Sequence, residues 1–168
     1  MQDDFPEVLD LIVEIPKGSR NKYEWDERRG VIRLDRVLSS AVFYNFDYGF
    51  VDDTRAADGD HTDAMLLIAE PTFPGCHVLA RPVGGLAMRD ENGEDFKVLC
   101  VTQSDPLYMH VQALEDVFPH RLREIEHFFE TYKLLEDKTV EVFGWRPREE
   151  ALEVLAHDRA AYLAEHAG

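Results

Sequence analysis

Three aspartates lie within one short segment, Asp58-Gly59-Asp60-His61-Thr62-Asp63. Carboxylates at this spacing can bind hard cations, which prefer oxygen ligands. An EF-hand loop is excluded, because counting from Asp58 places Asp63 where glycine is needed and Ala69 where glutamate is needed. Taken alone, the segment is more typical of a solvated acidic loop than of a metal site.

A second acidic turn, Asp90 to Asp95, stands at another strand boundary. Basic side chains occur close in sequence to carboxylates or tyrosines at four positions: Lys22, Arg36, Lys97 and Lys133. Two acidic turns could converge on one cluster of divalent cations, which bind through carboxylates and substrate phosphates. Lysine and arginine would then hold the remaining phosphate oxygens. The combined pattern therefore points to chemistry on a phosphate anion.

Composition limits the partners of the chain. Its 168 residues include 34 Asp and Glu against 18 Lys and Arg, for a formal charge of −16. Such a surface repels nucleic acid and anionic membranes, and no apolar run is long enough to span a bilayer. We therefore expect neither as a partner. Cys76 and Cys100 lack metal-ligand spacing and are interpreted as buried free thiols of a cytoplasmic protein.

The elements that must position these residues are short strands followed by helices. Alternating or apolar runs predict strands at residues 8–15, 22–25, 31–34, 64–69, 77–81, 86–88, 96–101 and 139–145. Asn92-Gly93 predicts a hairpin turn, and residues 105–117 an irregular connection. Two amphipathic helices are expected after Pro119 and Pro147, the first with apolar residues as far as Leu135.

The last helix should present an apolar face formed by Leu152, Leu155, Tyr162 and Leu163. Elements in this order indicate an α+β protein, with a mostly antiparallel small barrel or curled sheet and two helices against it. We expect one domain over residues 1–168.

Several ordered motifs resemble those of the soluble family I inorganic pyrophosphatases, over about residues 13–145. The matching pieces are residues 14–24, 34–38, 47–50, 58–63, 74–76, 80–84, 90–97 and 127–133. The resemblance implies an OB-like five-stranded barrel with additional strands and two flanking helices. It further implies Mg²⁺-dependent hydrolysis of pyrophosphate and a homo-oligomer, a hexamer in bacterial members.

Carried over by position, the resemblance assigns roles to fourteen residues. Asp60 would deprotonate the attacking water. The direct metal ligands would be Asp58, Asp63, Asp90 and Asp95, with Glu14, Glu24 and Glu91 in the outer shell. The phosphate-binding residues would be Lys22, Arg36, Tyr48, Lys97, Tyr132 and Lys133.

The departures from the family pattern lie beside the acidic loop. His61 and Thr62 replace a usual proline and aliphatic residue, Asn45 replaces a proline, and residues 51–53 lack another. Fewer prolines should loosen the loop entropically. His61 is interpreted as a solvent-facing residue without a role, or alternatively as a nitrogen ligand that would let Mn²⁺ or Zn²⁺ replace Mg²⁺.

Two other functions remain open at this point. One is a metal- or phosphate-binding relative that has lost catalysis, although no expected ligand or base is missing. The other is a broader phosphohydrolase acting on nucleotides or organic phosphates. The absence of an evident base-stacking slot argues against this alternative.

Overall fold

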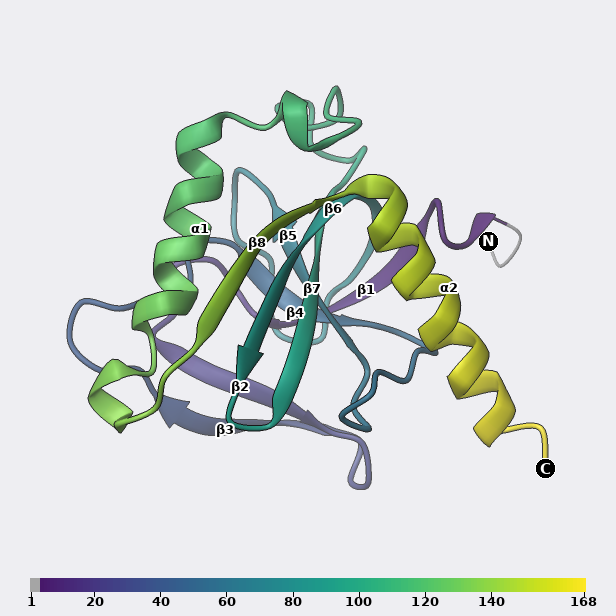
Figure 1. The fold of residues 1–168 in the computed structure, drawn as a ribbon, viewed down its shortest axis with the longest axis horizontal. Coiled ribbons are helices and arrows are strands. Elements are labelled where there is room, and N and C mark those ends of the chain that lie inside the picture. The colour runs from purple at the N-terminus through teal and green to yellow at the C-terminus, as the bar shows by residue number, and fades with distance from the viewer. Residues whose placement is uncertain (1–3) are drawn as a thin grey trace.

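The structure, a computed structural model, describes residues 4–168, so Met1–Asp3 of the expected domain lie outside the described residues. The described strands are β1 Leu9–Ile15, β2 Asn21–Asp26, β3 Val31–Val37, β4 Asp47–Val51, β5 Thr62–Leu67, β6 His77–Asp90, β7 Gly93–Val101 and β8 Glu141–Pro147. The α-helices are α1 Pro119–Thr131 and α2 Arg148–Glu165 (Figure 1). Within this part of the chain, no helix is both long and apolar enough to cross a bilayer.

Five strands close into a barrel. Hydrogen bonding runs in the order β1-β4-β5-β7-β6, and β1 also pairs with β6 to complete the ring. The β5–β7 pair is parallel, whereas the other pairs are antiparallel. Strand β8 extends the sheet beyond β6, and β2 with β3 forms a separate hairpin. These features confirm the expected α+β barrel with additional strands and two helices.

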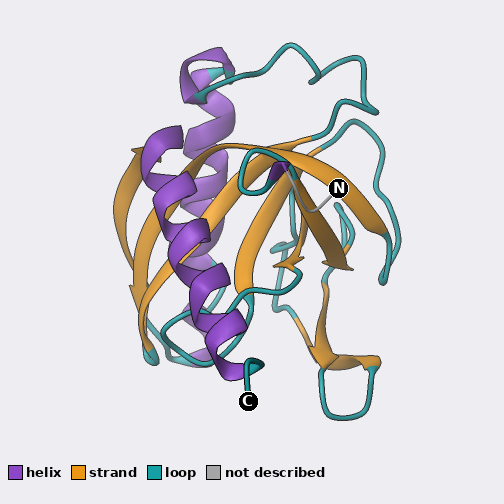
Figure 2. Cartoon of the chain, turned by 90° about the vertical axis from the view of Figure 1, so that its right-hand side faces the viewer, coloured by secondary structure: helices purple, strands orange, loops and turns teal. Residues whose placement is uncertain are grey.

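Alternating side chains give the strands two buried faces, as a period of two requires. Met65 of β5 faces a cluster that includes Phe129 of α1, whereas the adjacent Leu66 faces a cluster that includes Leu155 of α2. The two helices accordingly flank the strands on opposite sides in Figure 1, and Figure 2 shows α2 lying across the strands.

Strand β4, Asp47–Val51, was not predicted, and the bounds of β5, β7 and β8 differ from the prediction by two or three residues. Two other strands, β6 and β3, are longer than predicted. Residues 77–81 and 86–88 belong to one long strand, β6, because a register shift between Pro82 and Gly84 lets it bend without ending. Strand β3 continues through Asp35 and Arg36 to Val37, with an irregularity opposite Lys22 and Tyr23. The predicted Asn92-Gly93 hairpin is confirmed by the pairing of Asp90 with Gly93.

Burial along the helices also differs from the prediction. Helix α1 ends at Thr131, so Leu135 lies beyond it and is 71% exposed. On α2 the buried residues include Leu155 and also Asp158, whereas Leu163 is 58% exposed. Periodicity identified Leu163 as part of the apolar face, but the C-terminal end of α2 extends beyond the strands of the barrel (Figure 1). Of the two thiols, Cys100 is buried and Cys76 is partly exposed, so the expectation for Cys76 was wrong.

Candidate active site

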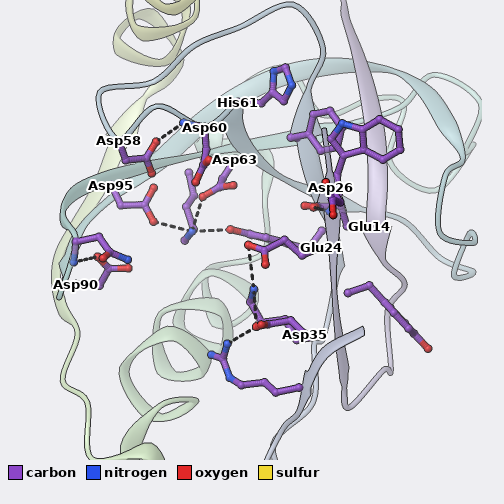
Figure 3. Close-up of a pocket in the computed structure, with 18 of the residues that line it drawn as sticks. Glu14, Glu24, Asp26, Asp35, Asp58, Asp60, His61, Asp63, Asp90 and Asp95 are labelled. Carbon is purple, nitrogen blue, oxygen red and sulfur yellow. Dashed lines mark hydrogen bonds and ion pairs between the residues drawn. The ribbon is translucent and has the colours of Figure 1, made fainter. Parts of the chain in front are cut away.

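One cavity of about 490 Å³ lies at an end of the barrel, and all fourteen residues predicted for the site line it (Figure 3). They come from β1 (Glu14), β2 (Lys22, Glu24), β3 (Arg36), β4 (Tyr48), the β4–β5 loop (Asp58, Asp60), β5 (Asp63), the β6–β7 hairpin (Asp90, Glu91, Asp95, Lys97) and the residues just after α1 (Tyr132, Lys133). Residues far apart in sequence therefore meet in one place, as the two acidic turns predicted.

The acidic loop is shaped by a sharp turn at Gly59, whose φ of +90° favours glycine. Asp58 Oδ1 accepts a hydrogen bond from the Asp60 backbone N–H at 2.9 Å, which fixes the two aspartates relative to each other. Burial raises the pKa of Asp60, and the neighbouring charges of Asp58 and Glu24 raise it further. A carboxylate with a raised pKa is a better proton acceptor than an ordinary surface aspartate.

Lys97 lies between two carboxylates and a phenol. Its Nζ is 2.8 Å from Asp95 Oδ2 and 3.0 Å from Asp63 Oδ2, and it donates to Tyr48 Oη at 2.6 Å. Burial raises the pKa of Asp95 even with this lysine beside it. Asp95 and Lys97, two residues apart on β7, therefore share one face of that strand, and the two carboxylates outnumber the one lysine.

Tyr48 is positioned by a close approach of two barrel strands. A Cβ on the next residue, Gly49, would lie 1.9 Å from the Ile12 backbone oxygen, so only glycine permits β4 to pack this tightly on β1. The Tyr48 ring also packs against the Tyr44 ring, with centroids 5.4 Å apart. The phenol is thus held rigidly toward Lys97.

Two carboxylates that sequence reasoning missed contact the basic residues of the site: Asp35 lines the cavity, whereas Glu136 is not among its lining residues. Asp35 lies 3.4 Å from Lys22 Nζ and 2.6 Å from Arg36 Nη1, and Glu136 lies 2.5 Å from Arg36 Nε. The proximity of Asp35 to Arg36 in sequence was a usable signal, whereas Glu136 is a hundred positions away. Arg36 Nη2 is buried without a hydrogen-bond partner among residues 4–168, so this donor is available to an anion.

Lys133 and Tyr132 follow directly after α1. Lys133 Nζ is 3.2 Å from Glu91 Oε1 and 3.4 Å from Asp90 Oδ2. The Tyr132 ring packs against Phe128 with centroids 5.1 Å apart. The end of α1 therefore adds a cation to the second acidic turn.

The four aspartates predicted as metal ligands face the cavity but do not form a compact cage. Within residues 4–168, no three Asp, Glu, His or Cys side chains converge in metal-binding geometry. Eleven carboxylates nevertheless line the cavity against five Lys and Arg side chains. Their oxygen donors suit Mg²⁺, which keeps several waters and so does not require every ligand to touch it directly.

Glu14 predicts a pH dependence of stability. Burial raises its pKa from 4.5 to about 7, although Trp25 N–H donates to its Oε2 at 2.7 Å. Because the folded state favours the protonated form, this contribution to stability is complete below pH 4.5 and is lost as pH rises through about 7. Glu14→Gln keeps an acceptor for Trp25 and should exceed the wild type in unfolding free energy at pH 8, by up to about 3 kcal/mol.

Urea unfolding in chelator at pH 4.5 and pH 8 measures this difference. The two proteins should be close in stability at the lower pH and should diverge at the higher one. A constant offset between them at both pH values would contradict the assignment of the titration to Glu14.

His61 is neither solvent-facing nor aimed at Asp60 and Asp63. Its side chain is 10% exposed and stacks on Phe50, with ring centroids 4.8 Å apart. Its Nδ1 donates to the Thr54 backbone oxygen at 2.9 Å, and its Nε2 lies 3.7 Å from Glu27 Oε1. The expectation of a solvent-facing residue was therefore wrong, and the ring nitrogens face protein groups.

We accordingly expect His61→Ala to leave the ratio of Mn²⁺-supported to Mg²⁺-supported activity unchanged. Loss of the stacked ring and of one hydrogen bond should lower the unfolding free energy by about 1–2 kcal/mol. Activity assays with each metal and urea unfolding measure the two effects. A ratio that shifts toward Mg²⁺ in the variant would restore the nitrogen-ligand hypothesis.

A phosphate anion together with divalent cations would complement the charges of this cavity, and a barrel with such a site belongs with the metal-dependent phosphohydrolases. Comparison with known proteins narrows the class. The inorganic pyrophosphatase family matches residues 11–163. The inorganic pyrophosphatase of Methanosarcina mazei is 54% identical over 155 residues, covering 92% of each chain.

Solved structures of inorganic pyrophosphatases have the same fold as this chain. The crystal structure of the Thermus thermophilus inorganic pyrophosphatase has a TM-score of 0.92 at 47% identity, covering 95% of this chain and 94% of that one. The Helicobacter pylori inorganic pyrophosphatase has a TM-score of 0.90 at 41% identity, covering 94% of each chain. The chain belongs to the inorganic pyrophosphatase family, a family of metal-dependent inorganic diphosphatases, and pyrophosphate hydrolysis is its reaction.

Proposed function

We propose that this chain hydrolyses inorganic pyrophosphate, the reaction of its family, with Mg²⁺ as cofactor and Asp60 as the general base. The observation that carries the proposal is the convergence of all fourteen assigned residues on one cavity. Asp60 lies between two proposed metal ligands, Asp58 and Asp63, and its raised pKa suits a proton acceptor.

Each group of residues has a distinct part in the proposed reaction. Bound divalent cations supply Lewis-acid activation of water and neutralise charge on the phosphate oxygens. Asp58, Asp63, Asp90 and Asp95 would hold these cations, with Glu14, Glu24 and Glu91 orienting the waters around them. Asp60 accepts the proton of the attacking water, and the freed Nη2 of Arg36 donates to a phosphate oxygen.

The other phosphate contacts come from three lysines and two tyrosines. Lys22, Lys97 and Lys133 would exchange their present carboxylate partners for phosphate oxygens. Tyr48 and Tyr132 are both 7% exposed, so their hydroxyl groups are positioned by packing rather than by solvent. Mn²⁺ or Zn²⁺ could substitute for Mg²⁺ at a site of this donor type.

A single comparison tests the proposal. Phosphate release is measured from pyrophosphate, ATP and a simple phosphomonoester, each with and without Mg²⁺. We expect rapid release from pyrophosphate with Mg²⁺ alone among these conditions. Equal rates on ATP or the monoester would indicate a broader phosphohydrolase, and no release from any substrate would indicate a binding protein without catalysis.

We also propose a homo-oligomer, a hexamer by analogy with bacterial relatives, that works in the cytoplasm. Large apolar side chains on the described surface support an interface, since Phe118 is 76% exposed and Phe73 64% exposed. The buried free thiol of Cys100 suits a reducing compartment. Sedimentation velocity at micromolar concentration measures the assembly, and a monomer would contradict the hexamer.

A further inference from the structure

The acidic loop is attached to the C-terminal half of α2, a helix outside the cavity. Thr62 Oγ1 donates to Asp158 Oδ2 at 2.8 Å, and Asp158 is only 5% exposed. Arg159 donates to the backbone oxygens of Asp53 at 2.6 Å and Asp52 at 3.1 Å. Helix α2 therefore holds the segment between β4 and β5 at both of its ends.

Arg55 connects the middle of that segment to the same helix. Its backbone N–H donates to the Asp158 backbone oxygen at 2.9 Å, and its Nε donates to Glu165 Oε2 at 2.9 Å. Its Nη1 donates to the Gly59 backbone oxygen at 2.9 Å, between Asp58 and Asp60. One planar guanidinium thus spans α2 and the turn that carries the proposed base.

The same guanidinium reaches the β2–β3 hairpin. Arg55 Nη2 lies 3.3 Å from Glu27 Oε1, in the turn of that hairpin, and Glu27 also lines the cavity. The Arg55 side chain is 13% exposed, although the Glu27 and Glu165 side chains that it pairs with are about half exposed. Burial by its partners fixes Arg55 in one geometry.

The loop has few backbone hydrogen bonds of its own, although side-chain hydrogen bonds at Asp58, His61 and Thr54 also connect its residues. Its own backbone hydrogen bonds are Gly59 N–H to the Ala56 oxygen and Ala56 N–H to the Asp60 oxygen, and Asp53 adopts a φ of +54°. A segment so short of regular structure gains its precision from outside contacts. Among those contacts, the one made by Arg55 reaches the Gly59 backbone oxygen, at the turn itself.

We propose that Arg55 is a positioning residue for Asp58 and Asp60, and that the C-terminal half of α2 is the support against which it holds them. The inference rests on the proposed roles of these two aspartates. Arg55 contacts neither the substrate nor the attacking water in the proposed reaction. It acts by fixing the Gly59 carbonyl, and so the direction in which both flanking carboxylates point.

Arg55→Ala should lower kcat for pyrophosphate by about 10- to 100-fold, since displacing a reacting group by about 1 Å has an effect of that order. The KM for pyrophosphate should change little, because Lys22, Arg36 and Lys133 bind the phosphates from other elements. Mn²⁺ affinity, measured without substrate by electron paramagnetic resonance, should weaken because Asp58 loses its fixed direction.

Arg148→Ala is the matched control. Arg148 is also an α2 arginine that donates to a backbone oxygen, that of Pro82 at 2.9 Å, and pairs with Glu7, but it does not line the cavity. It should retain wild-type kcat and Mn²⁺ affinity. Arg55→Lys keeps the charge but cannot span three partners, so its kcat should fall between those of the wild type and Arg55→Ala, and it serves if the alanine variant does not fold.

The outcomes separate this inference from the proposed function. If wild-type protein releases phosphate and the folded Arg55 variants match Arg148→Ala in kcat and Mn²⁺ affinity, the positioning role is overturned. If wild-type protein releases no phosphate, the proposed function fails, and the Mn²⁺ titration alone decides on Arg55. Weaker Mn²⁺ binding together with a selective loss of kcat in the Arg55 variants would support the role.

Discussion

Asp60→Asn is expected to lower kcat for pyrophosphate by about 10²- to 10⁴-fold, the range that general-base catalysis contributes. Asparagine has nearly the shape of aspartate but cannot accept the proton of the attacking water. The turn should survive, because the Asp60 backbone N–H still donates to Asp58 Oδ1 and Gly59 keeps its conformation. Metal binding should also persist in large part, since four other aspartates are the proposed ligands.

Asp53→Asn provides a control in the same loop. Asp53 has a φ of +54°, which asparagine tolerates, and its side chain does not line the cavity. Steady-state kinetics at saturating Mg²⁺ and pyrophosphate should therefore separate the two variants widely. Near-normal turnover in Asp60→Asn, with circular dichroism matching the wild type, would remove Asp60 from the role of base.

Removal of divalent cations should abolish activity, and restoration should require more than one ion per site. Eleven carboxylates already line the cavity, and pyrophosphate adds further negative charge that five Lys and Arg side chains do not offset. Activity should consequently rise cooperatively with free Mg²⁺ after dialysis against chelator. Ca²⁺ should inhibit, because its oxygen distances of about 2.3–2.6 Å exceed the roughly 2.0–2.1 Å that Mg²⁺ demands.

The measurement is phosphate release as a function of free Mg²⁺ at a fixed concentration of the magnesium–pyrophosphate complex. The fixed complex ensures that cooperativity reports on ions bound to the protein rather than on the substrate. Full turnover in excess EDTA would refute the requirement for metal. A hyperbolic dependence on free Mg²⁺ would instead reduce the requirement to a single protein-bound ion.

The strands could be predicted because their apolar residues repeat with a simple period and their turns carry strong local signals, such as Asn92-Gly93. Patterns within a single element failed to predict burial where tertiary packing determines it. Leu163 matches a helical period but is exposed, whereas Asp158 is buried because Thr62 donates to it from across the fold. Neither outcome is encoded within the helix itself.

The site was predictable in its residue types and in its ordered motifs, but its supports were not. The partners of Arg55 include Glu165, more than a hundred positions away, and no spacing rule links them. The orientation of His61 depends on Phe50 and Thr54, which become its neighbours only when β4 and β5 pair. Sequence patterns thus identify the groups that do chemistry more readily than the residues that orient those groups.

Closure of the barrel by the β1–β6 pair has a consequence for folding kinetics. It joins Leu9 to Ala80, and β5 must pair with β7 across the whole of β6. Contacts between such distant residues require large loops to close first, which slows folding. Glu14, Asp63 and Asp95 come together only when these pairings form. The metal site should therefore be absent from early folding intermediates, and added Mg²⁺ should slow unfolding more than it accelerates refolding.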